Sequence, residues 1–298
     1  MSVNIPDHYT ISFSTNISLL LQEKGSKLRG TVTEGHYTGK QASPVDQIGK
    51  VEMLQVVGRF SAMPRVDAGL DRRWVYPTDF HLPQLIDTFD KLRLLTDPES
   101  SYTQNAVYAA GRKVDTLILQ AAIGTAKTGE QGGTSTAFDS GNEIDVAVGG
   151  ANSRLNVAKL LAVKEKLRAN SVDFDTDPIY APLTAKDESA LLNEIQIVSS
   201  EFNERERPVL VEGKVHAFLG INFVYCELNE SVNAGTNEVN VPVWAKSGMH
   251  LGIWNDVQSE IDRRADLTGK PWQSYVTVTL GATRLEEGKV CNIESYRA

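Results

Sequence analysis

The alternation of apolar and polar residues is clearest in the last third of the chain. Within Trp272–Leu280 the two kinds of residue follow each other with period two, the pattern of a strand with one buried face. Val276, Val278 and Leu280 share one face. A Glu-Glu-Gly turn signal and a second short strand over 290–293 come next. The end of the chain is therefore predicted to complete a sheet.

The strongest helical pattern covers residues 98–123. Asp97 is placed to cap the helix and Pro98 suits its first position. Apolar residues then recur at steps of three and four, which predicts one continuous buried stripe. That stripe consists of Val107, Ala110, Val114, Leu117 and Ala121. Gly124 ends the helix, and the Gly/Ser/Thr-rich stretch 127–141 is predicted to be a loop.

The rest of the chain mixes further strands and helices without a regular alternation. Helices are expected over 153–168 and from Thr184 onward, where Asp187 stands at capping-box spacing. Strands are expected over 179–183 and on either side of Gly220 within 213–225. Residues 257–264 fit either a helix or one face of a strand. The fold class predicted from this mixture is α+β.

The first eighty residues have a different character. Residues 1–50 contain one short helical candidate, Ser18–Lys24, and little else to bury, so we expect an extended arm that orders only on a neighbouring molecule. Strand-like stretches at 51–57 and 72–76 flank an Asp-Ala-Gly turn signal, which predicts a long hairpin over 51–80. Arginine and tryptophan are enriched where proteins bury one another. The candidate contact residues on this hairpin are Arg59, Arg65, Arg72, Arg73 and Trp74. An ordinary surface hairpin is the alternative.

Size and charge limit the possible functions. The chain has 298 residues, of which 41% are hydrophobic, enough for a large core in two lobes. A formal net charge of −8 argues against sequence-independent binding of nucleic acid over the whole surface. It does not exclude a local basic face. No apolar run is long enough to span a bilayer and no signal peptide is recognisable, so a soluble cytoplasmic product is expected. Cys226 and Cys291 are expected to be buried and unpaired.

Motifs for catalysis, metal binding or nucleotide binding are incomplete. The stretch 124–129 lacks the Lys and Ser/Thr of a phosphate loop, and Glu34 stands where the first glycine before Gly39-Lys40 would be needed. Asp173, Asp175 and Asp177 begin like a calcium loop, but Pro178 and Thr184 replace its glycine and its bidentate glutamate. The five histidines form no zinc-binding spacing. We therefore expect no catalytic, cofactor-binding or metal-binding residues, although a catalytic pair assembled from distant residues stays open.

The order of these segments resembles the major capsid proteins of tailed bacteriophages, which share the Hong Kong 97-like fold. The resemblance covers most of the chain and rests on layout together with local patterns such as Gly213-Lys-Val, Phe218–Phe223 and Gly281–Glu287. It implies an N-terminal arm at 1–50 and an extended loop at 51–80. It also implies a peripheral domain from 81–150 and 271–298 with a spine helix at 98–123, and an axial domain at 151–270. The same layout favours a strand over 257–264.

The resemblance implies a structural role without a cofactor. The chain would assemble as pentamers and hexamers into an icosahedral shell that encloses double-stranded DNA, without reading its sequence. A separate scaffold protein, a portal and a decoration protein are implied partners, and the virion, after synthesis in the bacterial cytoplasm, is the implied location. Residues 51–80 contain no lysine, so the lysine cross-link that some relatives form from this loop is not expected. An encapsulin-type nanocompartment shell and an unrelated soluble enzyme are the alternatives.

Overall fold

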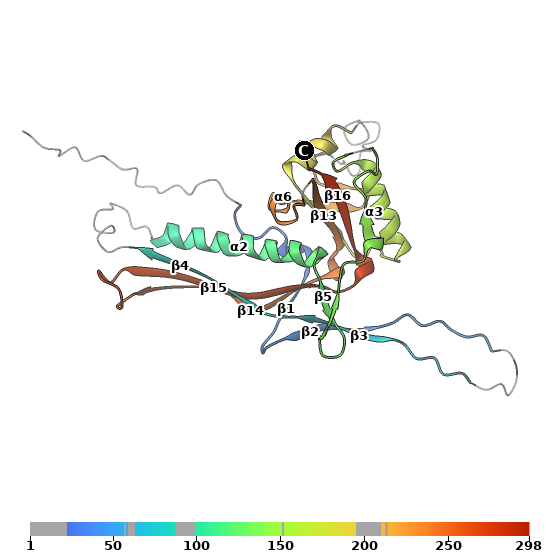
Figure 1. Cartoon of the computed structure of the whole chain (residues 1–298), viewed down its shortest axis with the longest axis horizontal. Coiled ribbons are helices and arrows are strands. Elements are labelled where there is room, and N and C mark those ends of the chain that lie inside the picture. Colours follow the sequence, from blue (N-terminus) through green and yellow to red (C-terminus); the bar gives the residue numbers. More distant parts are fainter. Residues whose placement is uncertain are drawn as a thin grey trace, which may run out of the picture.

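The computed structural model describes residues 23–56, 58, 63–86, 99–150, 152–194, 210–211, 214–235 and 237–297. It contains three larger sheets and a two-stranded one, with helices packed on two of the sheets (Figure 1). Strands and helices are mixed along the chain as the sequence predicts, so the α+β class is confirmed. The two-stranded sheet pairs β9 (Leu210–Val211) with β10 (Lys214–Val215).

The six-stranded sheet contains the larger of the two apolar cores. Its strand order is β11 (Ala217–Phe218), β12 (Ile221–Tyr225), β8 (Ile179–Leu183), β13 (Glu238–Ala245), β16 (Val290–Tyr296) and β7 (Glu143–Ile144). Helix α3 (Val157–Ala169) packs on it and buries Leu160, Val163 and Leu167. Helix α4 (Ala185–Leu192) and the short α6 (Asn229–Val232) complete this lobe. The predicted strand 179–183 and both predicted helices are confirmed, although the first helix begins at Val157 and not at Ser153. Asn156 and Thr184 are the N-caps.

A long four-stranded sheet forms the second lobe. Its order is β1 (Thr33–His36), β14 (Met249–Arg263), β15 (Trp272–Arg284) and β4 (Thr78–Ile86), and α2 (Glu99–Ile123) lies along one face (Figure 1). Val276, Val278 and Leu280 are buried on that face, as their alternation predicts. Residues 257–263 are strand, which resolves the ambiguous segment.

The buried side of α2 differs in part from the predicted stripe. Ala110 and Val114 are buried as expected, but Val107 is exposed and Leu117 and Ala121 are only partly covered. The buried face continues through Ala106, Ile118, Leu119 and Ala122. Both stripes satisfy helical spacing, and the position of the sheet selects between them.

The third sheet supports the extended loop. It consists of β2 (Ala42–Ile48), β3 (Leu70–Val75), β5 (Ala126–Thr128) and β6 (Thr134–Thr136). The hairpin therefore exists, but its first strand precedes the predicted 51–57, because pairing ends where the Gly49 amide donates to the Gly69 carbonyl. Residues 51–56 form no strand. The prediction of a plain loop over 127–141 is also wrong, because β5 and β6 form a hairpin there that extends the sheet.

Much of the predicted arm belongs to its own subunit. Leu28 and Val32 are buried beside α2, and β1 pairs in parallel with β14. The expectation that residues 1–50 become ordered only on a neighbouring molecule is therefore wrong for this part. Residues 1–22, with most of the helical candidate Ser18–Lys24, lie outside the described residues.

The two lobes exchange strands at their junction. The chain passes from β13 to β14 through the 3₁₀ turn Lys246–Gly248, and from β15 to β16 through Glu287–Lys289. β14, predicted with the axial domain, pairs in the sheet under α2, and β16, predicted with the peripheral domain, pairs in the six-stranded sheet. The sequence boundaries at 270 and 271 therefore do not separate the sheets. Below, the lobe with α2 is called the peripheral lobe and the other the axial lobe.

Candidate assembly surfaces

The extended loop was predicted at 51–80. Its two strands are β2 and β3, so the name is used below for residues 42–75, whose described part runs away from both lobes (Figure 1). Its base is tied to the rest of the subunit by β5, which pairs with Arg73 and Trp74 of β3. The Trp74 indole donates a 2.7 Å hydrogen bond to the Gly129 carbonyl, and Gln47 donates one of 2.6 Å to the Leu285 carbonyl. The base is thus a fixed platform for the residues beyond it.

Beyond this base the loop exposes an unusual amount of apolar surface. Among the described residues fifteen large apolar side chains are exposed, and eight of them lie between positions 48 and 70. These eight are Ile48, Val51, Met53, Leu54, Val56, Met63, Val66 and Leu70. Met53 and Met63 are 102% and 95% exposed, so no described part of the subunit covers them. Exposed apolar side chains gathered on one segment are typical of an interaction site.

The predicted arginine contacts are distributed unevenly over the loop. Arg65 is exposed and pairs with Asp67, and Arg72 pairs with Asp46 while lying 5.7 Å from the centre of the Trp74 ring. Arg73 is buried and pairs with Glu287 of its own subunit at 3.1 Å. Arg59 lies outside the described residues. Arg65 and Arg72 therefore face solvent, whereas Arg73 and Trp74 contact their own subunit. The apolar residues beside them are what the sequence interpretation overlooked, although five of the eight stand within residues 51–63 of the printed sequence.

The arm root, residues 23–36, is bound to α2 by a buried carboxylate. Asp115 accepts hydrogen bonds from the Ser26 hydroxyl at 2.5 Å and from the Lys27 and Leu28 amides at 2.9 and 3.0 Å. One helical turn earlier Gly111 lets the arm backbone lie against the helix, since a Cβ there would come within 2.4 Å of the Gly25 carbonyl carbon. Burial raises the pKa of Asp115.

Glu23 and Cys226 lie beside Asp115, close enough for the three to share a cation. The carboxylate of Asp115 is, however, already occupied by its three hydrogen bonds from the arm. Burial also raises the pKa of the Cys226 thiol to about 12, which disfavours the thiolate that binds metals. The cluster is explained by its role in holding the arm root.

A second contact ties the arm to β14. Thr33 donates to the Met249 carbonyl at 2.7 Å, so its hydroxyl oxygen is free to accept from Nδ1–H of His250 at 2.9 Å. The Tyr37 hydroxyl then donates to Nε2 of His250, also at 2.9 Å. This arrangement holds the imidazole neutral, and burial lowers its pKa to about 4.

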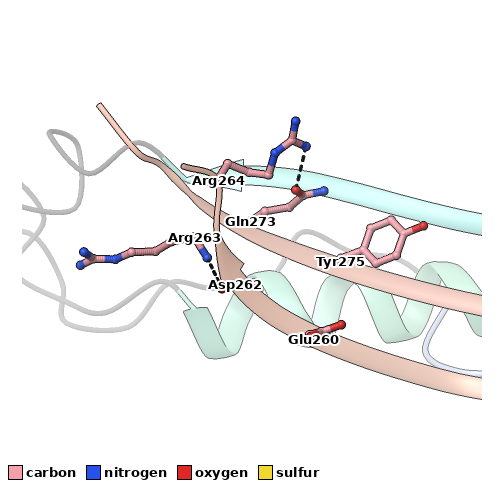
Figure 2. Close-up of a pocket in the computed structure, with 6 residues that line it drawn as sticks. All are labelled: Glu260, Asp262, Arg263, Arg264, Gln273 and Tyr275. Atoms are coloured by element: carbon pink, nitrogen blue, oxygen red, sulfur yellow. Dashed lines mark hydrogen bonds between the residues drawn. The ribbon is translucent and has the colours of Figure 1, made fainter. Parts of the chain in front are cut away.

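The peripheral sheet has an outer face that α2 does not cover. Because Val276 and Val278 point toward α2, Tyr275 points to the other side, opposite Glu260 in β14 and Pro83 in β4. Glu260, Asp262, Arg264, Gln273 and Tyr275 line a hollow of about 360 Å³ on this face together with Arg263 (Figure 2). The exposed Leu85 pairs with Gln273 on the same face. Apolar, acidic and basic side chains therefore lie side by side on the outer face, which we define as His81, Pro83, Leu85, Glu260, Asp262, Arg264, Gln273, Tyr275 and Thr277.

The incomplete motifs of the sequence have structural explanations. Asp173 accepts from the Asp175 amide and the Thr176 hydroxyl, and these bonds lower its pKa. Asp177 accepts from the amide and the hydroxyl of Ser247 in the 3₁₀ turn Lys246–Gly248. Asp173 therefore closes a local turn, and Asp177 joins two distant segments. Cys226 and Cys291 are buried and unpaired, as predicted. Within the described part of the chain, no helix is both long and apolar enough to cross a membrane.

Comparison with known proteins accounts for this combination of a packed body and an exposed loop. A family model described as phage capsid protein matches residues 5–296. The chain belongs to this family. The predicted resemblance and the predicted role as a major capsid protein are thereby confirmed, and the shell-forming role is structural. No curated protein matches the chain.

Solved structures show that the capsid protein has the fold its sequence suggests. The capsid protein of cyanophage P-SCSP1u is 14% identical, with a TM-score of 0.72 over 97% of this chain and 93% of the other. That of cyanophage Pam1 is 12% identical, with a TM-score of 0.73 over 96% of both chains. That of a native GTA particle is 12% identical, with a TM-score of 0.70 over 99% and 98%. At such low identity the likeness supports the fold, and the Hong Kong 97-like class is confirmed.

Proposed function

We propose that this capsid protein assembles in many copies, as pentamers and hexamers, into an icosahedral shell around packaged double-stranded DNA. The observation that supports this most directly is the exposed apolar surface of the extended loop. Burying an apolar side chain fully is worth about 1.5–3 kcal/mol. Half burial of the eight loop residues would therefore contribute on the order of 10 kcal/mol per subunit before the cost of ordering the loop. A monomer gains nothing from this surface.

The partner surface for the loop is, in this proposal, the outer face of the peripheral sheet in a second copy. Tyr275, Pro83 and Leu85 offer apolar contact, and the Glu260 and Asp262 carboxylates flank them. The loop offers matching chemistry in its methionines and in the exposed Arg65.

The remaining partners follow from the same role. A scaffold protein, a portal and a decoration protein would act with the shell, which is made in the host cytoplasm and ends in the virion. The acidic net charge of −8 suits a wall that must not retain the incoming genome, since strong phosphate binding would oppose packaging. The axial lobe would form the pentamer and hexamer centres, and the extended loop and the arm would join neighbours.

Electron microscopy of the expressed protein, alone and with its scaffold, tests the central claim. Closed particles are the expected result, and protein that stays monomeric under every condition would refute it. Residues 51–80 contain no lysine, so dissolved particles should give one band near 32.7 kDa in a denaturing gel. A ladder of linked rings would show that the loop is covalently joined after all.

A cross-linking experiment tests the partner surface. Because both native cysteines are buried, a Met53→Cys/Tyr275→Cys variant can be treated in assembled form with a short bis-maleimide. Linked dimers are expected if the loop reaches the outer face of a neighbour. Met53→Cys/Leu161→Cys is the matched control, since Leu161 is exposed on α3 in the other lobe. Equal dimer yields from the two variants would rule out the outer face as the receptor.

A further inference from the structure

We propose that Glu287 is a positioning residue that fixes the direction of the extended loop relative to the C-terminal end of α2. The inference concerns one subunit, and only its consequence for the shell depends on the proposed function. Glu287 lies in the 3₁₀ turn between β15 and β16, where the two lobes meet.

One carboxylate joins the loop to α2 through two guanidinium groups. Glu287 Oε1 accepts from Arg73 of β3 at 3.1 Å, and its Oε2 accepts from Arg284 at 2.6 Å. Arg284 in turn donates to the Ala122 and Gly124 carbonyls at 2.9 and 2.8 Å. These carbonyls belong to the end of α2, where a cation is favoured by the helix dipole. The chain of contacts therefore runs from loop to carboxylate to helix end.

Burial makes this chain of contacts hard to replace. The side chain of Arg284 is fully buried and that of Arg73 is 7% exposed. Among the described residues, Glu287 is the acidic partner of both. Removing one partner of a buried ion pair leaves an uncompensated charge, which is strongly destabilising. Water cannot readily take over, because the guanidinium groups are enclosed.

A second connection runs parallel to the ionic one. Only two residues separate the end of α2 at Ile123 from the start of β5 at Ala126, and β5 pairs with β3. The corner after β3 is also packed tightly, since a Cβ at Gly281 would come within 2.2 Å of the Tyr76 carbonyl oxygen. With Glu287 in place, the loop base and the last turn of α2 form one unit. A neighbour that pulls the loop would thus move the helix end.

Hydrogen exchange on the full-length chain tests this directly, with all variants kept in the same assembly state. Glu287→Gln keeps the size of the side chain and removes its charge. We expect amide exchange to rise about tenfold both in β3, at 72–75, and in the last turn of α2, at 120–123, because charged hydrogen bonds are lost at both ends. The matched control is Glu286→Gln, because the exposed Glu286 adjoins Glu287 in sequence but pairs only with Lys289 among the described residues. An effect confined to one end, or equal in the two variants, would overturn the inference.

A second variant covers the case in which Glu287→Gln does not fold. Arg73→Gln removes the loop side of the contact and leaves the pair between Glu287 and Arg284. Faster exchange at 120–123 together with 72–75 would support the coupling, and a change in β3 alone would refute it. Particle formation is recorded in parallel. Failure of the unaltered protein to assemble would count against the proposed function and leave the exchange result valid.

Discussion

The arm root and the extended loop carry similar expectations from the sequence but are opposites in the structure. Both lie near the N-terminus, and both are predicted to find their contacts on neighbouring molecules. The arm root buries Leu28 and Val32 and gives its backbone amides to Asp115. The loop leaves Met53 and Met63 fully exposed and forms no strand over 51–56. The arm root makes its contacts within the subunit, whereas the apolar side chains of the loop remain exposed to solvent.

The difference shows which property marks a surface made for a neighbour. Polar composition does not, because the arm root is polar and yet packed on α2. Exposed apolar side chains on a segment that leaves the body do, because no intramolecular contact repays their exposure. The predictions below test this division, beginning with the largest expected change in the free energy of unfolding of the subunit.

Removing the carboxylate of Asp115 should cause the largest loss. In Asp115→Ala the Lys27 and Leu28 amides and the Ser26 hydroxyl lose their acceptor, and each buried unsatisfied group costs about 1–3 kcal/mol. We expect urea unfolding of the subunit to report a loss of about 3–5 kcal/mol. Gln120→Ala, an exposed change on the same helix, is the control. Equal midpoints for the two variants would mean that the arm root is not part of the folded unit.

Acid should loosen the arm through His250. Its pKa is about 4 in the folded state, below the ordinary value of 6.5, so between these values the unfolded state binds more protons. The free energy of unfolding therefore falls as pH drops from 6.5 to 4, by at most about 3 kcal/mol. Urea titrations at several pH values should show this fall, and His250→Gln should remove it. His36→Gln, at an exposed position, should retain it; a loss of the pH dependence in both variants would contradict this assignment.

Changes in the loop should spare the subunit and impair the shell. Met53→Ser/Met63→Ser alters two uncovered side chains, so the free energy of unfolding should change by less than about 0.5 kcal/mol. Their burial in a neighbour is worth about 3 kcal/mol or more, so the protein concentration needed for assembly should rise at least about tenfold. Light scattering measures that threshold, with Val107→Ser, at an exposed position of α2, as an equally polar change outside the proposed contacts. A threshold that stays unchanged would remove these methionines from the contact.

The smallest effect is expected from Arg72. Its pair with Asp46 is exposed to solvent, and such pairs contribute little. Arg72→Ala should leave the thermal midpoint of the subunit unchanged and reduce particle yield only slightly. Arg73→Ala is the informative counterpart, because Arg73 is buried and its loss should lower the thermal midpoint. Identical midpoints in the two variants would contradict the different burial of these neighbours.

The sequence predicts those parts of the fold that depend on local periodicity. Strand β8, the buried face of β15 and the C-terminal end of α2 follow from alternation, spacing and the glycine at 124. The predicted caps Asp97 and Pro98 lie outside the described residues. No local sequence pattern predicts which distant segments pair with each other. Asp115 accepts from the amide of Leu28, 87 residues earlier in the chain. Residue spacing within a short window predicts neither this contact nor the pairing of β2 with β3 across a long loop.

The sequence also predicts the candidate assembly surfaces only in part. The sequence predicts a hairpin here, but arginine and tryptophan content alone does not identify the exposed apolar residues as its main contact surface. Arg73 illustrates the reason. Its type suggests a contact with a neighbour, whereas its position opposite Thr128 of β5 places it inside the subunit, and only the three-dimensional register reveals that.

The two crossings between the lobes have a mechanical consequence. The turns Lys246–Gly248 and Glu287–Lys289 touch each other, with the Leu285 amide donating to the Gly248 carbonyl at 2.8 Å. Two covalent connections bound side by side leave no free joint, so the angle between the lobes is set by the fold itself. A subunit of this kind behaves as a rigid body. The curvature of any shell built from it would therefore arise at the interfaces between subunits.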